Sequence, residues 1–514
     1  MNDDTTSDAP FHEPFDEPFA EPDGAAGAPD RTNRPWAAVV AVAAMASWPF
    51  LSLVAVNSDQ PLELATITGW WLATLIPTLL VTLLAGRRSV WLGRTVATWL
   101  TVMIWTVFSF PVIESLHLRF GPFEQSMTTA RMWVIVATGV ALVTALVAGV
   151  RPVQQFVLVV SVAFAASAGG QLVIGLATPR APVVATAIEP SASFQTRPNV
   201  WFIVLDGLAS DAWIERRTGY DARPFEDALE AHGVQVQRAA RSNYPLTHIS
   251  ISSTMMMEYG FEGLEEPRAQ SFFDQLQGKN AVVELMRANG YGYAHAYPGF
   301  WSGSRCSGVE DLCLGSNSSI SDTDAALRDM VAFGDRLHRS GQHTDIADAN
   351  DPGQVVGRII AADMPTPTFS VVHMLNPHAP LLRDADCNVR TEIELRFSAW
   401  GDGPEYADAV RCLHQQLERA VDQIMAVDDD PVIVIQGDHG PRLGIDWNVP
   451  GGVTLGDEMH FSILSAIRLP SSCPNVDVPD DLTSVNTFRI VRACLEGTAP
   501  ALLEDITYPI HAER

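Results

Sequence analysis

Positive charge is scarce in this chain. Its 514 residues include 33 Lys and Arg against 60 Asp and Glu, which gives a formal net charge of -27 at pH 7. A nucleic-acid surface would need clustered basic residues. The charge balance therefore argues against such a surface, and we expect no nucleic-acid partner.

Cysteine is absent from the first part of the chain. An even number of cysteines confined to one part indicates an oxidising compartment. Six cysteines allow fifteen pairings, and we favour the three pairs nearest in sequence. A zinc cluster is the competing interpretation, although no CxxC knuckle is present. The favoured pairs are Cys306–Cys313, Cys387–Cys412 and Cys473–Cys494.

Long apolar runs are confined to residues 35–178, where five follow one another. Each is near the ~20 residues needed to cross a ~30 Å hydrocarbon core. We predict a domain of five transmembrane helices; the alternative is that some runs are core helices of a soluble protein. The runs are roughly 35–57, 66–86, 90–113, 131–150 and 153–178.

Arginines near the predicted spans give their orientation. Most lie in the N-terminal tail and the even-numbered breaks, whereas the other two breaks hold only Arg119 and Arg131. The positive-inside rule then places the N-terminus in the cytoplasm and the chain after about residue 180 outside. We therefore expect a multi-pass plasma (inner) membrane protein, in agreement with the cysteine distribution. The arginines of the first group are Arg31, Arg34, Arg87, Arg88 and Arg151.

The segments that flank the predicted spans are polar. Residues 1–34 combine Asp, Glu, Pro and Gly with few aliphatic residues, which predicts a disordered acidic cytoplasmic tail. A short binding motif is the less favoured interpretation of the tail. It lacks a basic stretch followed directly by an apolar core, so we do not expect a secretory signal. Residues 179–197 are rich in Pro, Ala and Ser and are expected to form a linker.

Residues 198–514 are expected to form one extracytoplasmic α/β domain. Short apolar runs bounded by turn residues predict buried strands, and helical patterns separate them. Strands that alternate with helices indicate a mostly parallel sheet with helices on both faces. The predicted strands are 199–206, 291–297, 368–375, 431–438 and 461–469.

Polar residues follow the ends of these strands. Asp206 ends the first strand, Asp438 and His439 end the fourth, and Thr247 lies after a Tyr–Pro turn. Open α/β sheets place their sites beyond the carboxyl ends of strands. Two carboxylates, an imidazole and a hydroxyl suit a divalent ion such as zinc or manganese, which would lower the pKa of the threonine hydroxyl. Alternatives are an ordinary turn at Asp206 and a helix N-cap at Thr247.

The order of four motifs resembles the alkaline phosphatase superfamily in its sulfatase-like branch. These motifs are "NVWFIVLDG", "NYPLTHIS", "VVHMLNPHAP" and "VIVIQGDHG". With five spans ahead of them, the chain is most similar to lipoteichoic acid synthases and lipid A phosphoethanolamine transferases. The resemblance covers roughly residues 198–470 by motif and residues 35–178 by architecture only.

This resemblance implies roles for six residues. Asp206, Thr247, Asp438 and His439 would bind one metal ion, with Thr247 as the nucleophile. His378 in "NPHAP" would contact the substrate phosphate. The sixth, His460, would be a later substrate-site or second-metal histidine.

Three departures from the superfamily patterns narrow the interpretation. The "CxPSR" or "SxPSR" signature of sulfatases is absent, so we do not expect a sulfate-ester hydrolase. Asn376 and His378 stand where two-metal phosphodiesterases carry an Asp and a His, so a second, weaker metal site is conceivable. His373, inside a predicted strand, is expected to be a packed, hydrogen-bonded residue.

The leading hypothesis is a membrane-bound phosphotransferase. It would move a phospho-headgroup, of phosphoglycerol or phosphoethanolamine type, from a phospholipid to an envelope glycan or lipid through a phosphothreonine. The first alternative is a membrane-tethered phosphodiesterase, phosphatase or other sulfatase-like hydrolase. A non-catalytic membrane sensor is a weaker alternative. Transport is weaker still, because the spans contain few ionisable residues.

Overall fold

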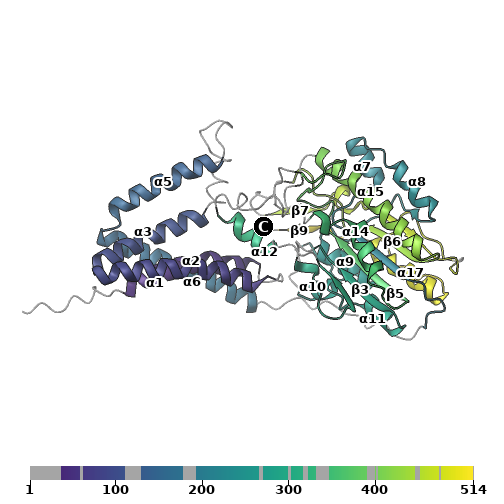
Figure 1. The fold of residues 1–514 in the computed structure, drawn as a ribbon, viewed down its shortest axis with the longest axis horizontal. Helices are drawn as coiled ribbons and strands as arrows, with labels where there is room; N and C mark the ends of the chain where they lie inside the picture. Colours follow the sequence, from purple (N-terminus) through teal and green to yellow (C-terminus); the bar gives the residue numbers. More distant parts are fainter. Residues whose placement is uncertain are drawn as a thin grey trace, which may run out of the picture.

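A computed structural model shows an elongated molecule with a helix bundle at one end and an α/β domain at the other (Figure 1). The predicted tail, 1–34, and most of the predicted linker, 179–197, lie outside the residues that the structure describes. Those residues are 36–57, 62–109, 129–177, 193–264, 270–298, 302–315, 322–331, 347–390, 400, 403–445, 452–473 and 476–512.

One helix occupies each of the five predicted spans. Four of them, α1, α2, α3 and α6, are long and apolar enough to cross a membrane. The fifth, α5, is shorter over its described apolar part, Trp133–Val147, because a turn before Arg151 ends it early. The prediction of five equivalent spans is therefore reduced to four spans and one shorter apolar helix. The bounds are α1 Trp36–Val56, α2 Leu64–Arg88, α3 Val90–Phe108, α5 Thr129–Val147 and α6 Arg151–Ala177.

The bundle helices expose large apolar side chains. Leu146 is 83% exposed and Phe156 is 68% exposed, values that would be costly in water. Such surfaces are typical of helices that face lipid. Within the bundle, α1 packs against α6, α3 and α2.

The α/β domain is built on a seven-stranded sheet with the order β2-β8-β6-β1-β5-β3-β4. Strand β1 pairs in parallel with β5 and β6, and β3 pairs in parallel with β5 and β4. Strands β8 and β2 add an antiparallel edge. The predicted mostly parallel sheet is confirmed. The strands are β1 Val200–Leu205, β2 Gln235–Val236, β3 Gly292–Ala296, β4 Leu312–Leu314, β5 Thr368–Met374, β6 Val432–Gly437 and β8 Ser465–Arg468.

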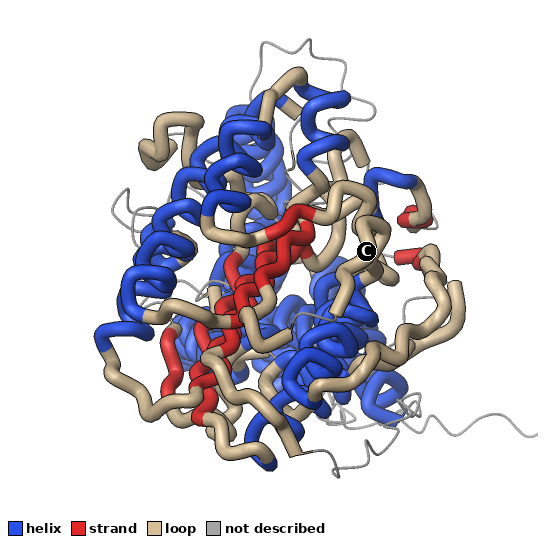
Figure 2. The backbone as a smooth tube through the Cα atoms, turned by 90° about the vertical axis from the view of Figure 1, so that its right-hand side faces the viewer, coloured by secondary structure: helices blue, strands red, loops and turns tan. Residues whose placement is uncertain are grey.

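Helices cover both faces of this sheet (Figure 2). Alternate side chains of a strand point to opposite faces. In β1, Trp201, Ile203 and Leu205 join one core cluster with α7, α8, α14 and α15, and the residues between them join the other with α9, α11 and α17. The bounds are α7 Asp211–Thr218, α8 Arg223–Ala231, α9 Thr247–Met256, α11 Ala281–Ala288, α14 Pro352–Ala361, α15 Pro404–Val427 and α17 Thr487–Glu496.

Smaller elements complete the domain. They include a two-stranded sheet of β7 and β9 and the short helices around the main sheet. These elements are α10 Gln270–Leu276, α12 Asp322–Asp329, α16 Glu458–Phe461, β7 Val453–Leu455 and β9 Ile510–Ala512.

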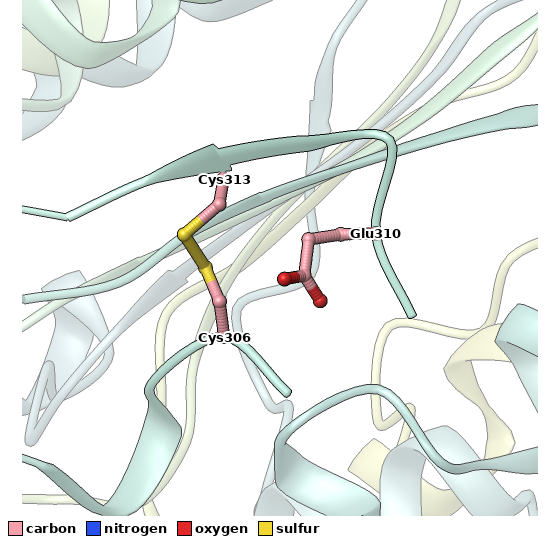
Figure 3. A group of neighbouring side chains, drawn as sticks. All are labelled: Cys306, Glu310 and Cys313. Atoms are coloured by element: carbon pink, nitrogen blue, oxygen red, sulfur yellow. A yellow bond between two sulfur atoms is a disulfide. The ribbon is translucent and has the colours of Figure 1, made fainter. Parts of the chain in front are cut away.

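The three favoured cysteine pairs are disulfides in the structure. Cys306 and Cys313 lie beside Glu310 in a group that by composition could hold a metal ion (Figure 3). Their sulfurs are bonded to one another, however, so neither is a thiolate ligand. No cysteine is free, and the zinc-cluster alternative is wrong.

Helix α12 joins the α/β domain to the bundle and lies between the two parts in Figure 1. The indole of Trp70, in α2, donates a hydrogen bond of 3.0 Å to Asp324 Oδ1 in α12. Leu327 of α12 is fully buried in a cluster with Phe50 and Phe108 of the bundle. The α/β domain is therefore docked onto the bundle through side chains as well as joined to it by the chain.

Candidate active site

The register of the central strands brings two carboxylates together. Strands β1 and β6 run in parallel, with Leu205 opposite Gly437. The next residues, Asp206 and Asp438, therefore emerge at the same edge of the sheet. Both are 3% exposed. The prediction that the strand ends share one location holds for these two strands.

The N-terminus of α9 delivers Thr247 to the same place. Thr247 is the first residue of α9, and Ser250 ties this turn to the strand end by donating to the Asp438 carbonyl at 2.5 Å. Thr247 Oγ1 lies 3.2 Å from His439 Nε2 and donates to Asp206 Oδ1 at 3.5 Å. The four residues predicted as metal ligands thus lie together in the structure.

Hydrogen bonds orient two of these side chains. His439 Nδ1 lies 2.7 Å from the Gly440 carbonyl oxygen and donates to it, so Nε2 carries the lone pair. Asp438 Oδ1 accepts from the backbone N–H groups of Gly207 at 2.8 Å and His439 at 2.7 Å. Its Oδ2 lies 3.6 Å from His439 Nε2. The free lone pairs of both side chains therefore converge.

Burial shifts the pKa values of this group in the directions expected of a cation site. Desolvation and the Asp438 charge raise the pKa of Asp206 well above its usual range. Desolvation raises the pKa of Asp438 to about 6, although two backbone N–H groups oppose it. Desolvation and the Arg442 charge lower the pKa of His439. The two buried carboxylates repel one another, and a divalent cation between them would relieve that repulsion.

This donor set fits a divalent metal ion. Ligand atoms of Asp206, Asp438 and His439 lie within 4.8 Å of one another, and Thr247 adds a hydroxyl. Two oxygen ligands, one imidazole nitrogen and a further oxygen are a set that zinc and manganese accept. In the described part of the chain, the disulfide group around Glu310 is the other cluster of this kind, so no second metal group is found there.

Arg442 is a member of the site that sequence reasoning missed. Its side chain is 4% exposed, and Nη2 donates to His439 Nε2 and to the Pro245 carbonyl, each at 3.0 Å. The guanidinium therefore stands beside Thr247 and the carboxylates. One signal was available: an arginine follows the predicted ligand His439 by three residues in "GDHGPR".

Two further predicted histidines border the site with opposite tautomers. His378 Nδ1 lies 2.5 Å from the Ala379 carbonyl oxygen and donates to it, so a neutral ring has its lone pair on Nε2. Its ring centroid is 6.5 Å from that of His439. His460 Nδ1 accepts from the Asp457 N–H at 3.1 Å, so a neutral ring carries its proton on Nε2, which is buried without a hydrogen-bond partner. His460 therefore presents a donor, and His378 presents an acceptor.

Close packing forms one wall of the site. Gly207 adopts a φ of 73°, and a Cβ there would meet the Trp400 ring at 2.3 Å. Trp400 also contacts the His378 ring edge-on, with a centroid distance of 4.4 Å. The glycine after Asp206 is thus required both by its backbone conformation and by the indole. The alternative of an ordinary turn at this position is correct as local structure, and the turn also forms part of the site.

The other two residues considered from sequence are structural in their contacts. Asn376 donates through Nδ2 to the Asn350 carbonyl at 3.0 Å. His373 is 1% exposed within β5, and burial together with His295 lowers its pKa to about 3. Neither side chain belongs to the metal group.

The fold and the site define a membrane-anchored enzyme of the alkaline phosphatase superfamily, with four spans and a sulfatase-like α/β domain. The chain belongs to the sulfatase family, because the family model described as Sulfatase matches residues 198–462. The resemblance predicted from the motifs is confirmed by this match.

Solved structures are similar to the chain in fold. The C-terminal periplasmic domain of EcEptC from Escherichia coli is 12% identical, with a TM-score of 0.38, and the match covers 62% of this chain and 86% of that chain. Lipooligosaccharide phosphoethanolamine transferase A (EptA) from Neisseria meningitidis is 11% identical, with a TM-score of 0.39 and coverages of 89% and 95%. Phosphonate monoester hydrolase from Agrobacterium radiobacter is 13% identical, with a TM-score of 0.37 and coverages of 60% and 79%. No curated protein sequence matches.

Proposed function

We propose that the protein transfers a phospho-headgroup from a phospholipid to an envelope glycan or lipid. The observation that carries the proposal is the position of Thr247 Oγ1, at a helix N-terminus and 3.2 Å from His439 Nε2, beside two buried carboxylates. A helix N-terminus favours the phosphate anion, and hydroxyls at such places serve as nucleophiles. The transmembrane helices would keep this site beside its lipid donor.

In the first step, Thr247 Oγ1 attacks the phosphorus of the donor headgroup. A bond forms between Oγ1 and phosphorus, and the bond from phosphorus to the diacylglycerol oxygen breaks. A divalent ion held by Asp206, Asp438, His439 and Thr247 would lower the pKa of the threonine hydroxyl and offset phosphoryl charge. The diacylglycerol oxygen takes up a proton and leaves.

The surrounding donors bind the phosphoryl group. Arg442 and the Nε2–H of His460 supply positive charge and a hydrogen bond where negative charge collects. Desolvation lowers the pKa of His460 to about 4, and a neutral imidazole is a poor acid. We therefore assign His460 to phosphate binding, and His378 accepts a hydrogen bond from the reacting groups.

In the second step, a hydroxyl of the acceptor displaces Thr247 from phosphorus. We place the N-terminus in the cytoplasm and the α/β domain outside, because Arg87, Arg88 and Arg151 mark one end of the bundle and all six cysteines lie in the domain. The donor would then come from the outer leaflet.

The proposal is tested by mass spectrometry of full-length protein incubated with total lipids. A phospho-adduct is expected on Thr247 and should be absent from Thr247→Ala. Thr254, buried in the same helix and bonded to the Ser250 carbonyl, offers a matched control in Thr254→Ser. Diacylglycerol release by wild-type protein without an adduct on Thr247 would exclude the phosphothreonine mechanism.

A hydrolase is the second candidate, supported by membership of a family described as Sulfatase. Water would then replace the acceptor hydroxyl. The two candidates differ in their products when acceptor is withheld. A transferase should accumulate diacylglycerol in proportion to modified acceptor, whereas a hydrolase should release phosphorylated headgroup at the same rate with and without acceptor.

A further inference from the structure

A second polar cavity lies in the helix bundle, far from the site described above. Its volume is about 260 Å³, and it is bounded by the start of α1, the second and third turns of α3 and the start of α6. Helix α12 docks near Phe50, toward the other end of α1. The cavity therefore lies at the end of the bundle opposite the α/β domain.

The cavity is lined by positive and polar side chains. Arg94 and Arg151 reach it from α3 and α6, and Gln154 and Gln155 extend the polar surface along α6. None of the described residues that line it is acidic, although the chain as a whole is strongly acidic. The lining therefore selects an anion.

Backbone dipoles add to this charge. The first turns of α1 and α6 both face the cavity, through Trp36 and Arg151. A helix N-terminus carries a partial positive charge and unsatisfied N–H groups. Two N-termini and two guanidinium groups thus converge on one cavity.

Arg94 lies at membrane depth, which is an unusual place for a charge. It is the fifth residue of α3, after the apolar residues Val90, Trp91 and Leu92. Ionisable residues inside transmembrane helices are costly and commonly mark a functional site. A phosphate held beside Arg94 would offset that cost.

We propose that this cavity binds the phosphate of an anionic phospholipid. Basic pockets between transmembrane helices on the cytoplasmic side suit such headgroups. The volume is slightly below the ~300–1,000 Å³ of ordinary small-molecule sites, which suits a headgroup whose acyl chains remain outside. Trp36, 53% exposed at the start of α1, provides the aromatic residue that is common at the headgroup level.

A lipid is favoured over free phosphate by the surroundings of the cavity. Val159 and Phe156 of α6, close along the helix to Gln155, are 66% and 68% exposed. Acyl chains would cover these apolar side chains, which free phosphate cannot do. The cavity is far from Thr247, so the proposal is independent of the proposed transfer reaction.

The test is lipid binding by purified full-length protein in detergent, measured by native mass spectrometry. Phosphatidylglycerol, phosphatidylcholine and inorganic phosphate are the three probes. We expect bound phosphatidylglycerol, and a loss of affinity of about tenfold or more when Arg94→Gln and Arg151→Gln are combined. Arg87→Gln with Arg88→Gln removes the same charge at the same end of the bundle, outside the cavity lining, and should leave binding unchanged.

Further variants keep the outcomes distinct. Arg94→Lys with Arg151→Lys should retain the lipid, and each single Gln variant gives the comparison if the double variant does not fold. Asp438→Asn should still bind, because lipid held here is not lipid held as donor. Equal binding by the cavity variant and its control would overturn the proposal. So would equal displacement by millimolar phosphate, or binding only after removal of residues 1–30, which would identify the acidic tail as the occupant.

Discussion

Thr247 Oγ1 and His439 Nε2 lie 3.2 Å apart, although 192 residues separate them in the chain. Their proximity follows from two local facts. Strand β6 is hydrogen-bonded beside β1, and Ser250 fastens the first turn of α9 to the Asp438 carbonyl. The nucleophile and the proposed ligand are therefore held by the same edge of the sheet.

Asp438→Asn is predicted to abolish both metal retention and activity. An amide is a weaker ligand than a carboxylate for a cation held mainly by oxygen. The fold should persist, because an amide oxygen can still accept from the Gly207 N–H. Elemental analysis of purified protein measures the metal. The control is Asp363→Asn, since Asp363 is exposed and has a φ of 49°, which Asn tolerates. An unchanged metal content would remove Asp438 from the ligand set.

Arg442→Gln is predicted to lower kcat/KM by about 10²–10³ while the metal content is unchanged. The guanidinium stands beside Thr247 and would stabilise charge on the phosphoryl group, which a neutral amide cannot do. Arg442→Lys should restore part of the activity. Steady-state kinetics with a soluble activated phosphodiester provide the measurement, with Arg358→Gln on the exposed face of α14 as control. Loss of metal together with activity would assign Arg442 a structural role.

His460→Gln is predicted to raise KM more than it lowers kcat. The Nε2–H of His460 is buried without a partner and would contact the phosphate, while its low pKa argues against proton transfer. A glutamine amide can still donate, but from a different position. The kinetic parameters between pH 6 and pH 9 are the readout. An altered pH optimum in the variant would instead assign proton transfer to His460.

Asp211→Asn is predicted to stabilise the protein at alkaline pH, by about 1–3 kcal/mol. Burial and the Glu226 charge raise the pKa of Asp211 well above its usual range, against the opposing charge of Arg238. His414 Nε2 lies 3.4 Å away, but burial lowers the pKa of His414 to about 3 and keeps it neutral.

The direction follows from proton linkage. A raised folded-state pKa means that the stability contributed by protonated Asp211 is complete below the unfolded value of ~3.9 and is lost as pH rises through the folded value. Asparagine has no such loss, so its advantage should grow from pH 5 to pH 8. Thermal unfolding followed by tryptophan fluorescence measures it. Asp221→Asn, at an exposed carboxyl whose pKa Arg223 lowers to about 2, should give no such gain. Identical pH slopes for Asp211→Asn and wild type would contradict the prediction.

Removal of the Cys387–Cys412 disulfide is predicted to cost about 3–4 kcal/mol, because it closes a loop of 25 residues in the unfolded chain. The bond ties the loop after β5, which carries His378, to α15. Thermal unfolding of the double alanine variant, compared with wild type under non-reducing conditions, gives the loss. Thiol labelling of native protein is the companion measurement. Six readily alkylated cysteines would contradict the disulfides and the exported location together.

The sequence was sufficient for the elements that have a strong local pattern. The aliphatic runs of β1, β5 and β6 predicted buried parallel strands, and their ends located Asp206, Asp438 and His439. Strand β2 was missed because two residues show no periodicity. The antiparallel direction of β8 was also not predicted, since strand direction depends on the connections between elements rather than on composition.

Side-chain contacts between distant segments could not be read from the sequence. Arg442 is a site residue because its guanidinium reaches both His439 and the Pro245 carbonyl, 197 residues away. The tautomers of His378 and His460 depend on the carbonyl of Ala379 and the N–H of Asp457. Such partners are known only once the loops are folded.

The contact between α12 and the bundle bears on which acceptors the enzyme can use. Trp70 and Asp324, 254 residues apart, join the two parts of the molecule, and Leu327 is fully buried between them. The α/β domain therefore stands at one height above the bilayer instead of swinging on a flexible chain. An acceptor must bring its hydroxyl to that height, so its length beyond the membrane surface becomes a selection rule that operates before any chemical recognition.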